Sequence, residues 1–146
     1  MYHALIWILT IEVLGLIALP LTFSLFRRLP DRGIIFSKVL GLLLGSYLLW
    51  VLGLAHVLPN TQYSILLVLA VLALASGLVA RRQLPEIVDF LRRERVPLLT
   101  AEMVFLGLYF VWLSVVAFSP AINHTEQPMD FAFLNAILKS RFFPPE

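Results

Sequence analysis

Four long apolar stretches separated by short polar connectors dominate the chain and predict membrane-spanning helices. They cover residues 6–26, 34–54, 63–80 and 98–118. The first would be about 32 Å long as a helix at ~1.5 Å per residue, which matches a hydrocarbon core of about 30 Å. It is also too long for the core of a signal peptide and has no basic leader, so we expect it to remain as a helix. The pattern predicts an all-α, polytopic membrane protein with a single membrane domain over residues 1–146.

Two further segments have helical patterns of a different kind. Along residues 84–95, apolar side chains repeat on one side and charged side chains occupy the other. This predicts an amphipathic helix in the plane of the interface, which Pro97 should end. Residues 128–139 follow the last span and are apolar on nearly every side, with Pro128 at the first helical position and Gln127 as a plausible cap. They predict an outer juxtamembrane helix.

The basic residues predict the orientation of the chain. Nine of the eleven lysines and arginines fall on one side of a four-span arrangement, and Lys139 and Arg141 fall on the other. The nine are Arg27, Arg28, Arg32, Lys38, Arg81, Arg82, Arg92, Arg93 and Arg95. The positive-inside rule therefore places the arginine-rich connectors in the cytoplasm. We expect a multi-pass protein of the cell membrane whose stretch at residues 123–135 faces outward.

Composition agrees with a bilayer and excludes several functions. With 60% hydrophobic and only 14% charged residues, the chain has too much apolar surface for one small soluble core. No cysteine is present, which rules out disulfides and thiolate metal sites. A formal charge of +2 is too small to indicate nucleic acid as a partner. We expect membrane lipid to surround the protein and to be its partner.

Three ionisable residues lie inside the predicted spans. Glu12 is expected to bond to a neighbouring helix, with a proton or substrate role as the alternative. Lys38 is expected to snorkel to the interface, and Glu102 to reach back to Arg93 or Arg95. A proton or ion pathway through Glu12, Lys38 and Glu102 is a weaker alternative.

The second span also carries a glycine pair. Gly41 and Gly45 have the small-xxx-small spacing that lets two helix backbones approach closely. We expect them to mark a packing face.

The polar residues that suggest chemistry gather after the fourth span. His124, Glu126 and Asp130 lie within a short stretch. Its residues Glu126-x-Pro128-Met129-Asp130-x-Ala132-Phe133-Leu134-Asn135-Ala136-Ile137, followed by Phe143-Pro144-Pro145, are similar to the signature of the YYY (Chlor-Arch-YYY) family. That family comprises bacterial and archaeal membrane proteins of unknown function. The resemblance covers the family's amino-terminal portion and implies that more spans follow.

The same arrangement resembles the first outer loop of GT-C type membrane glycosyltransferases, which use polyprenyl-phosphate sugars. The resemblance implies that Asp130 is the loop acid, acting as acceptor-activating base or metal ligand, with Glu126 as the second catalytic candidate. Sugar transfer needs a carboxylate that takes the acceptor proton and a cation that stabilises the departing phosphate. The two acids could share Mg²⁺ or Mn²⁺, with His124 as a further ligand, but two carboxylates in one loop do not assign a metal.

Two non-catalytic interpretations remain open. Asp130 would also complement the positive end of the outer helix, which contributes roughly 0.3–1 kcal/mol. The whole chain would also suit an accessory subunit of a larger membrane complex, because a glycine-lined helix face and apolar outer helices can pack against other membrane subunits. The sequence thus predicts part of a glycosyltransferase-like enzyme or a structural subunit.

Overall fold

The computed structural model describes residues 2–118 and 126–144, and within these ranges all of the regular secondary structure is helical. Its helices are α1 (Tyr2–Leu25), α2 (Ser37–Leu54), α3 (Gln62–Arg93), α4 (Arg95–Phe118) and α5 (Gln127–Lys139). The first four are long and apolar enough to cross a membrane. The predicted all-α, four-span architecture is confirmed.

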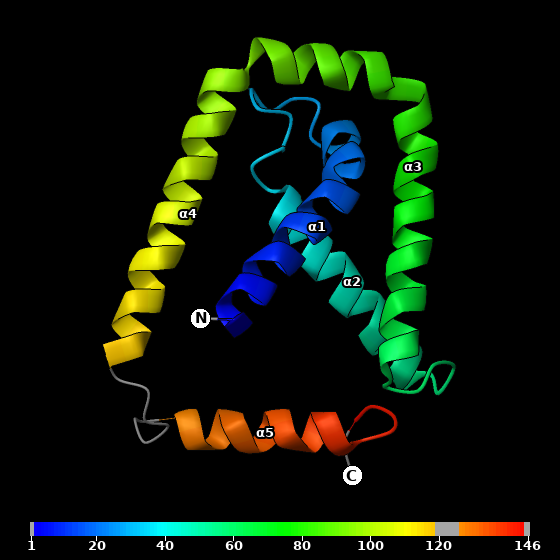
Figure 1. The fold of residues 1–146 in the computed structure, drawn as a ribbon. Coiled ribbons are helices and arrows are strands. Elements are labelled where there is room, and N and C mark those ends of the chain that lie inside the picture. Colours follow the sequence, from blue (N-terminus) through cyan, green and yellow to red (C-terminus); the bar gives the residue numbers. More distant parts are fainter. Residues whose placement is uncertain (1, 119–125, 145–146) are drawn as a thin grey trace.

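The largest departure from the predicted boundaries is in α3. The expected third span and the expected interfacial helix form one continuous helix with Pro85 inside it. Figure 1 shows this helix sharply bent, so that its C-terminal part runs across one end of the molecule. Proline lacks an N–H group and clashes with the carbonyl four residues earlier, which kinks a helix without necessarily ending it. The prediction that residues 84–95 run in a different direction from the third span is correct. The prediction that the two segments are separate helices is wrong.

The next boundary is also shifted. α3 ends at Arg93, and only Glu94 separates it from α4, which begins at Arg95. Pro97 therefore lies in the first turn of α4 and does not end the preceding helix. The first backbone N–H groups of a helix have no intrahelical acceptor, so a proline there removes no hydrogen bond.

α1 and α2 cross at backbone contact. A Cβ atom on Gly41 would overlap the carbonyl group of Leu14, and one on Gly15 would lie 2.8 Å from Cγ of Lys38. Of the predicted glycine pair, Gly41 therefore lies at the crossing of the first two spans, whereas a Cβ atom on Gly45 would lie 3.4 Å from Leu69 of α3. α3 packs on the same pair through a buried stripe at every fourth residue, which consists of Ser64, Val68, Leu72 and Ser76.

The C-terminal part of α3 packs against other parts of the protein. Ile87 is only 4% exposed. Arg32, in the connector between α1 and α2, pairs with Glu86 at 2.6 Å and lies over the rings of Phe23 and Phe90, 4.7 and 5.7 Å from their centroids. The expected interfacial helix is thus attached to the α1–α2 connector.

Candidate functional site

The acids of the predicted signature lie at the start of α5. The helix begins at Gln127, so Glu126 is its N-cap and Pro128 is its second residue, one position later than expected. The carbonyl of Glu126 accepts hydrogen bonds from the N–H groups of Met129 and Asp130, both at 3.0 Å. Asp130 remains the acid of the first turn, as predicted.

Glu126 and Asp130 are both exposed. They are four residues apart at a helix start, which places them on the same side of α5. His124, the further metal ligand considered above, lies outside the described residues. Among the residues that the structure describes, no group of three or more histidine, cysteine, aspartate or glutamate side chains could hold a metal ion. The described part of this site therefore offers two accessible carboxylates.

The far end of α5 is fixed by the connector between α2 and α3. Asn60 donates from its backbone N–H to the carbonyl of Arg141 and from its side-chain amide to the carbonyl of Ile137, both at 2.7 Å. The ring of Phe142 lies 4.8 Å from the ring of His56, and Phe143 packs on Gly53. These contacts hold α5 crosswise, at the end of the molecule opposite the bent part of α3 (Figure 1).

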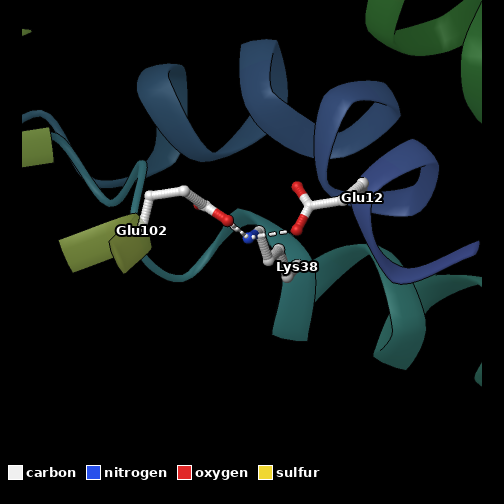
Figure 2. A network of polar contacts seen from close by, with 3 residues as sticks. All are labelled: Glu12, Lys38 and Glu102. Carbon is white, nitrogen blue, oxygen red and sulfur yellow. Dashed lines mark hydrogen bonds and ion pairs between the residues drawn. The ribbon is translucent and has the colours of Figure 1, made fainter. Parts of the chain in front are cut away.

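A second cluster of ionisable groups joins three of the spanning helices. Figure 2 shows the ammonium group of Lys38 on α2 between the carboxylates of Glu12 on α1 and Glu102 on α4. The Nζ atom lies 2.7 Å from Oε1 of Glu12, and 2.5 and 2.7 Å from the two oxygens of Glu102. The same Nζ lies 4.0 Å from the centroid of the Phe105 ring. We refer to Glu12, Lys38 and Glu102 as the carboxylate–lysine triad.

The triad corrects two predictions. Lys38 does not snorkel to the interface, because its side chain is only 15% exposed and is bound by both acids. Glu102 bonds to Lys38 and does not reach back to Arg93 or Arg95. The expectation that Glu12 bonds to a neighbouring helix is confirmed. In an apolar environment, an ammonium group whose three donors all face carboxylate oxygens is far less costly than an unpaired one.

The triad is one of two polar contacts that connect α4 to the α1–α2 pair in the described structure. The other is the hydroxyl of Tyr109, which donates to the carbonyl of Ala4 at 2.6 Å. None of the residues of α4 is buried. The position of this helix therefore depends on a few polar contacts more than on side-chain packing.

A cavity of about 460 Å³ lies beside the triad. Its walls come from α1, from α2 with the preceding connector, from the end of α3 and from α4, and most of its lining side chains are apolar. The charged groups that line it are the three triad residues and Arg95. The sequence signal for this site was the presence of three ionisable residues within apolar spans, which mark functional or structural sites in membranes.

The fold and these sites define a polytopic, all-α membrane protein with acids at the start of α5 and within the spans. The profile of the family described as "Uncharacterized membrane protein (DUF2298)" matches residues 44–146, and the chain belongs to this family. The match includes Glu102, Glu126 and Asp130, whereas Glu12 and Lys38 precede it. No curated protein and no solved structure matches the chain.

Proposed function

We propose that the protein is the amino-terminal part of a membrane glycosyltransferase that uses a lipid-phosphate sugar, with Asp130 as the catalytic base. The observation that carries the proposal is the placement of Asp130. It is exposed in the first turn of a helix that follows the fourth candidate span and lies across one end of the molecule. The resemblance of this arrangement to the first outer loop of GT-C enzymes supports the same assignment.

The chemistry requires an accessible carboxylate at the membrane surface. The acceptor hydroxyl forms a bond to the anomeric carbon while the bond from that carbon to the lipid phosphate breaks. The hydroxyl proton passes to the carboxylate of Asp130, and the phosphate leaves with the bonding electron pair. A positioned base of this kind contributes typically about 10²- to 10⁴-fold in rate. Glu126, on the same side of α5, is the second candidate for this role or for orienting the acceptor.

The orientation that we propose for the protein in the membrane rests on which segments lie at each end of the molecule. The connector after α1 and the bent part of α3 lie at one end, and α5 lies at the other (Figure 1). With the arginine-rich end in the cytoplasm, α5 faces outward, where lipid-linked sugars are used by the enzymes that this layout resembles.

The test measures sugar transfer by the full protein, with a radiolabelled polyprenyl-phosphate sugar as donor and total membrane glycolipid and glycoprotein as acceptors. We expect Asp130→Asn to lower the transfer rate about 10²-fold or more. The matched control is Asp89→Asn, which makes the same chemical change at an exposed acid on the bent part of α3. Transfer at the wild-type rate by Asp130→Asn would refute the catalytic assignment.

A second candidate function is that of an accessory subunit. The observation in its favour is the large apolar surface of α4 and α5, including Phe118, which is 90% exposed, and Leu138, which is 76% exposed. Exposed apolar surface on a spanning helix faces either lipid or another subunit. Stable co-purification with other membrane proteins, together with no transfer by the wild-type protein, would favour this function.

A further inference from the structure

The cavity beside the carboxylate–lysine triad has two walls whose apolar side chains are exposed in the described structure. On the α1–α2 side, Leu16 is 69% exposed and Val39 is 63% exposed, and on the α4 side Leu99 is 62% exposed. These helices are long and apolar enough to span a membrane. In a bilayer, such facing apolar walls favour a hydrocarbon occupant, because burial of apolar surface away from water is favourable. A volume of about 460 Å³ lies within the range of roughly 300–1,000 Å³ that is typical of ligand pockets.

The two cationic residues that line the cavity, Lys38 and Arg95, differ in whether they are paired with carboxylates. Lys38 has its three donors occupied by Glu12 and Glu102, so it has none left for a ligand. Arg95 lines the cavity and is exposed, and none of the ion pairs formed among the described residues involves it. Arg95 is therefore the cationic residue of the lining that is left to bind a ligand.

The position of Arg95 fits the orientation of a membrane lipid. It is the first residue of α4, and Glu102 lies seven residues further along, about 10 Å at ~1.5 Å per residue. A headgroup bound at Arg95 would lie at the arginine-rich end of the helix. Its chain would then run along α4 toward the triad, against Leu99 and Phe105, which line the cavity.

We propose that this cavity is a binding site for an anionic phospholipid, with the phosphate on Arg95 and one acyl chain along the apolar walls between α4 and the α1–α2 pair. The guanidinium group binds phosphate oxygens through paired N–H donors, which a neutral side chain of the same length cannot reproduce. The lipid adds apolar contact to α4, none of whose residues is buried in the described protein. This site is at the opposite end of the molecule from Asp130 and is independent of the proposed transferase function.

The test uses the full protein, purified in mild detergent and incubated with dioleoyl phosphatidylglycerol or dioleoyl phosphatidylcholine, with bound lipid counted by native mass spectrometry. We expect the wild type to retain one phosphatidylglycerol molecule in preference to phosphatidylcholine. Arg95→Gln should weaken phosphatidylglycerol binding roughly tenfold or more, the value of one charge-assisted hydrogen bond. Arg93→Gln is the matched control, because it removes the same charge two residues away at an exposed arginine that does not line the cavity.

A second variant tests the cavity itself. Leu99→Trp fills space between the walls without changing any charge, and it should lower retention of phosphatidylglycerol while the helical content stays at the wild-type level. Equal loss in Arg93→Gln and Arg95→Gln would mean a general attraction of anionic lipid to this end, and would overturn the proposal. Retention of phosphatidylglycerol by Leu99→Trp at the wild-type level would also overturn it. So would a wild-type protein that retains no phospholipid, the result expected if another part of the protein fills the cavity.

Discussion

Replacement of Lys38 by methionine gives the most informative test of how the spans are held together. Methionine matches the aliphatic part of the lysine side chain in length, so the substitution mainly removes the only cation of the carboxylate–lysine triad. Glu12 and Glu102 then face each other without the ammonium group that lies 2.7 and 2.5 Å from their oxygens. We expect the variant to be less stable because two carboxylates without a counter-charge remain beside an apolar cavity.

The magnitude follows from the burial of the three groups. Removal of one partner from a buried ion pair costs about 3–5 kcal/mol. The carboxylates here are partly exposed, with side-chain exposures of 34% for Glu12 and 37% for Glu102. Partial solvation reduces the effect, so we expect a loss of roughly 2–3 kcal/mol. For a chain of this size that corresponds to a fall in Tm of about 4–12 °C.

The assay is thermal unfolding in detergent, followed by circular dichroism at the helix band. The triple variant Glu12→Gln, Lys38→Met, Glu102→Gln removes all three charges and should recover much of the lost stability, because no unpaired charge remains. Lys139→Met is the control at an exposed lysine in the last turn of α5. If Lys38→Met unfolds at the wild-type temperature, or if the triple variant is as unstable as the single one, the triad does not stabilise the fold by charge.

Two further substitutions test other contacts. Gly41→Ala should destabilise the protein by about 2 kcal/mol, because its Cβ would overlap the Leu14 carbonyl and separate α1 from α2. Gly77→Ala, where nothing lies within 4 Å, should stabilise α3 by roughly 0.5–1 kcal/mol. Equal Tm values for Gly41→Ala and Gly77→Ala would contradict the close crossing of α1 and α2. Asn60→Ala removes the side-chain bonds to the carbonyls of Ile137 and Ser140 and should increase hydrogen exchange at residues 136–141. Asn135→Ala removes only a bond within α5 and is its control, so equal exchange in both variants would mean that Asn60 does not hold the helix.

The candidate site at α5 was largely predictable from local sequence. A proline followed by an acid after a long apolar run predicts a helix start wherever it occurs, because helix capping and the helix dipole act over one turn. The prediction placed the start of α5 within one residue of its position and placed Asp130 in the first turn. How α5 is held could not be predicted, because Asn60 reaches Ile137 across 77 residues of sequence.

The sequence by itself determined the class of protein and the four spans. An apolar run of about 20 residues is long enough to cross the bilayer, whatever its neighbours are. It did not determine whether Pro85 ends or bends α3, because a kinked helix persists only when packing such as that of Ile87 stabilises both halves. Nor did it determine the partners of Lys38, because Glu12 and Glu102 are 26 and 64 residues away along the chain. Only the adjacency of α1, α2 and α4 brings these three charges together, since a charge within an apolar span pairs with whichever opposite charge the tertiary structure places beside it.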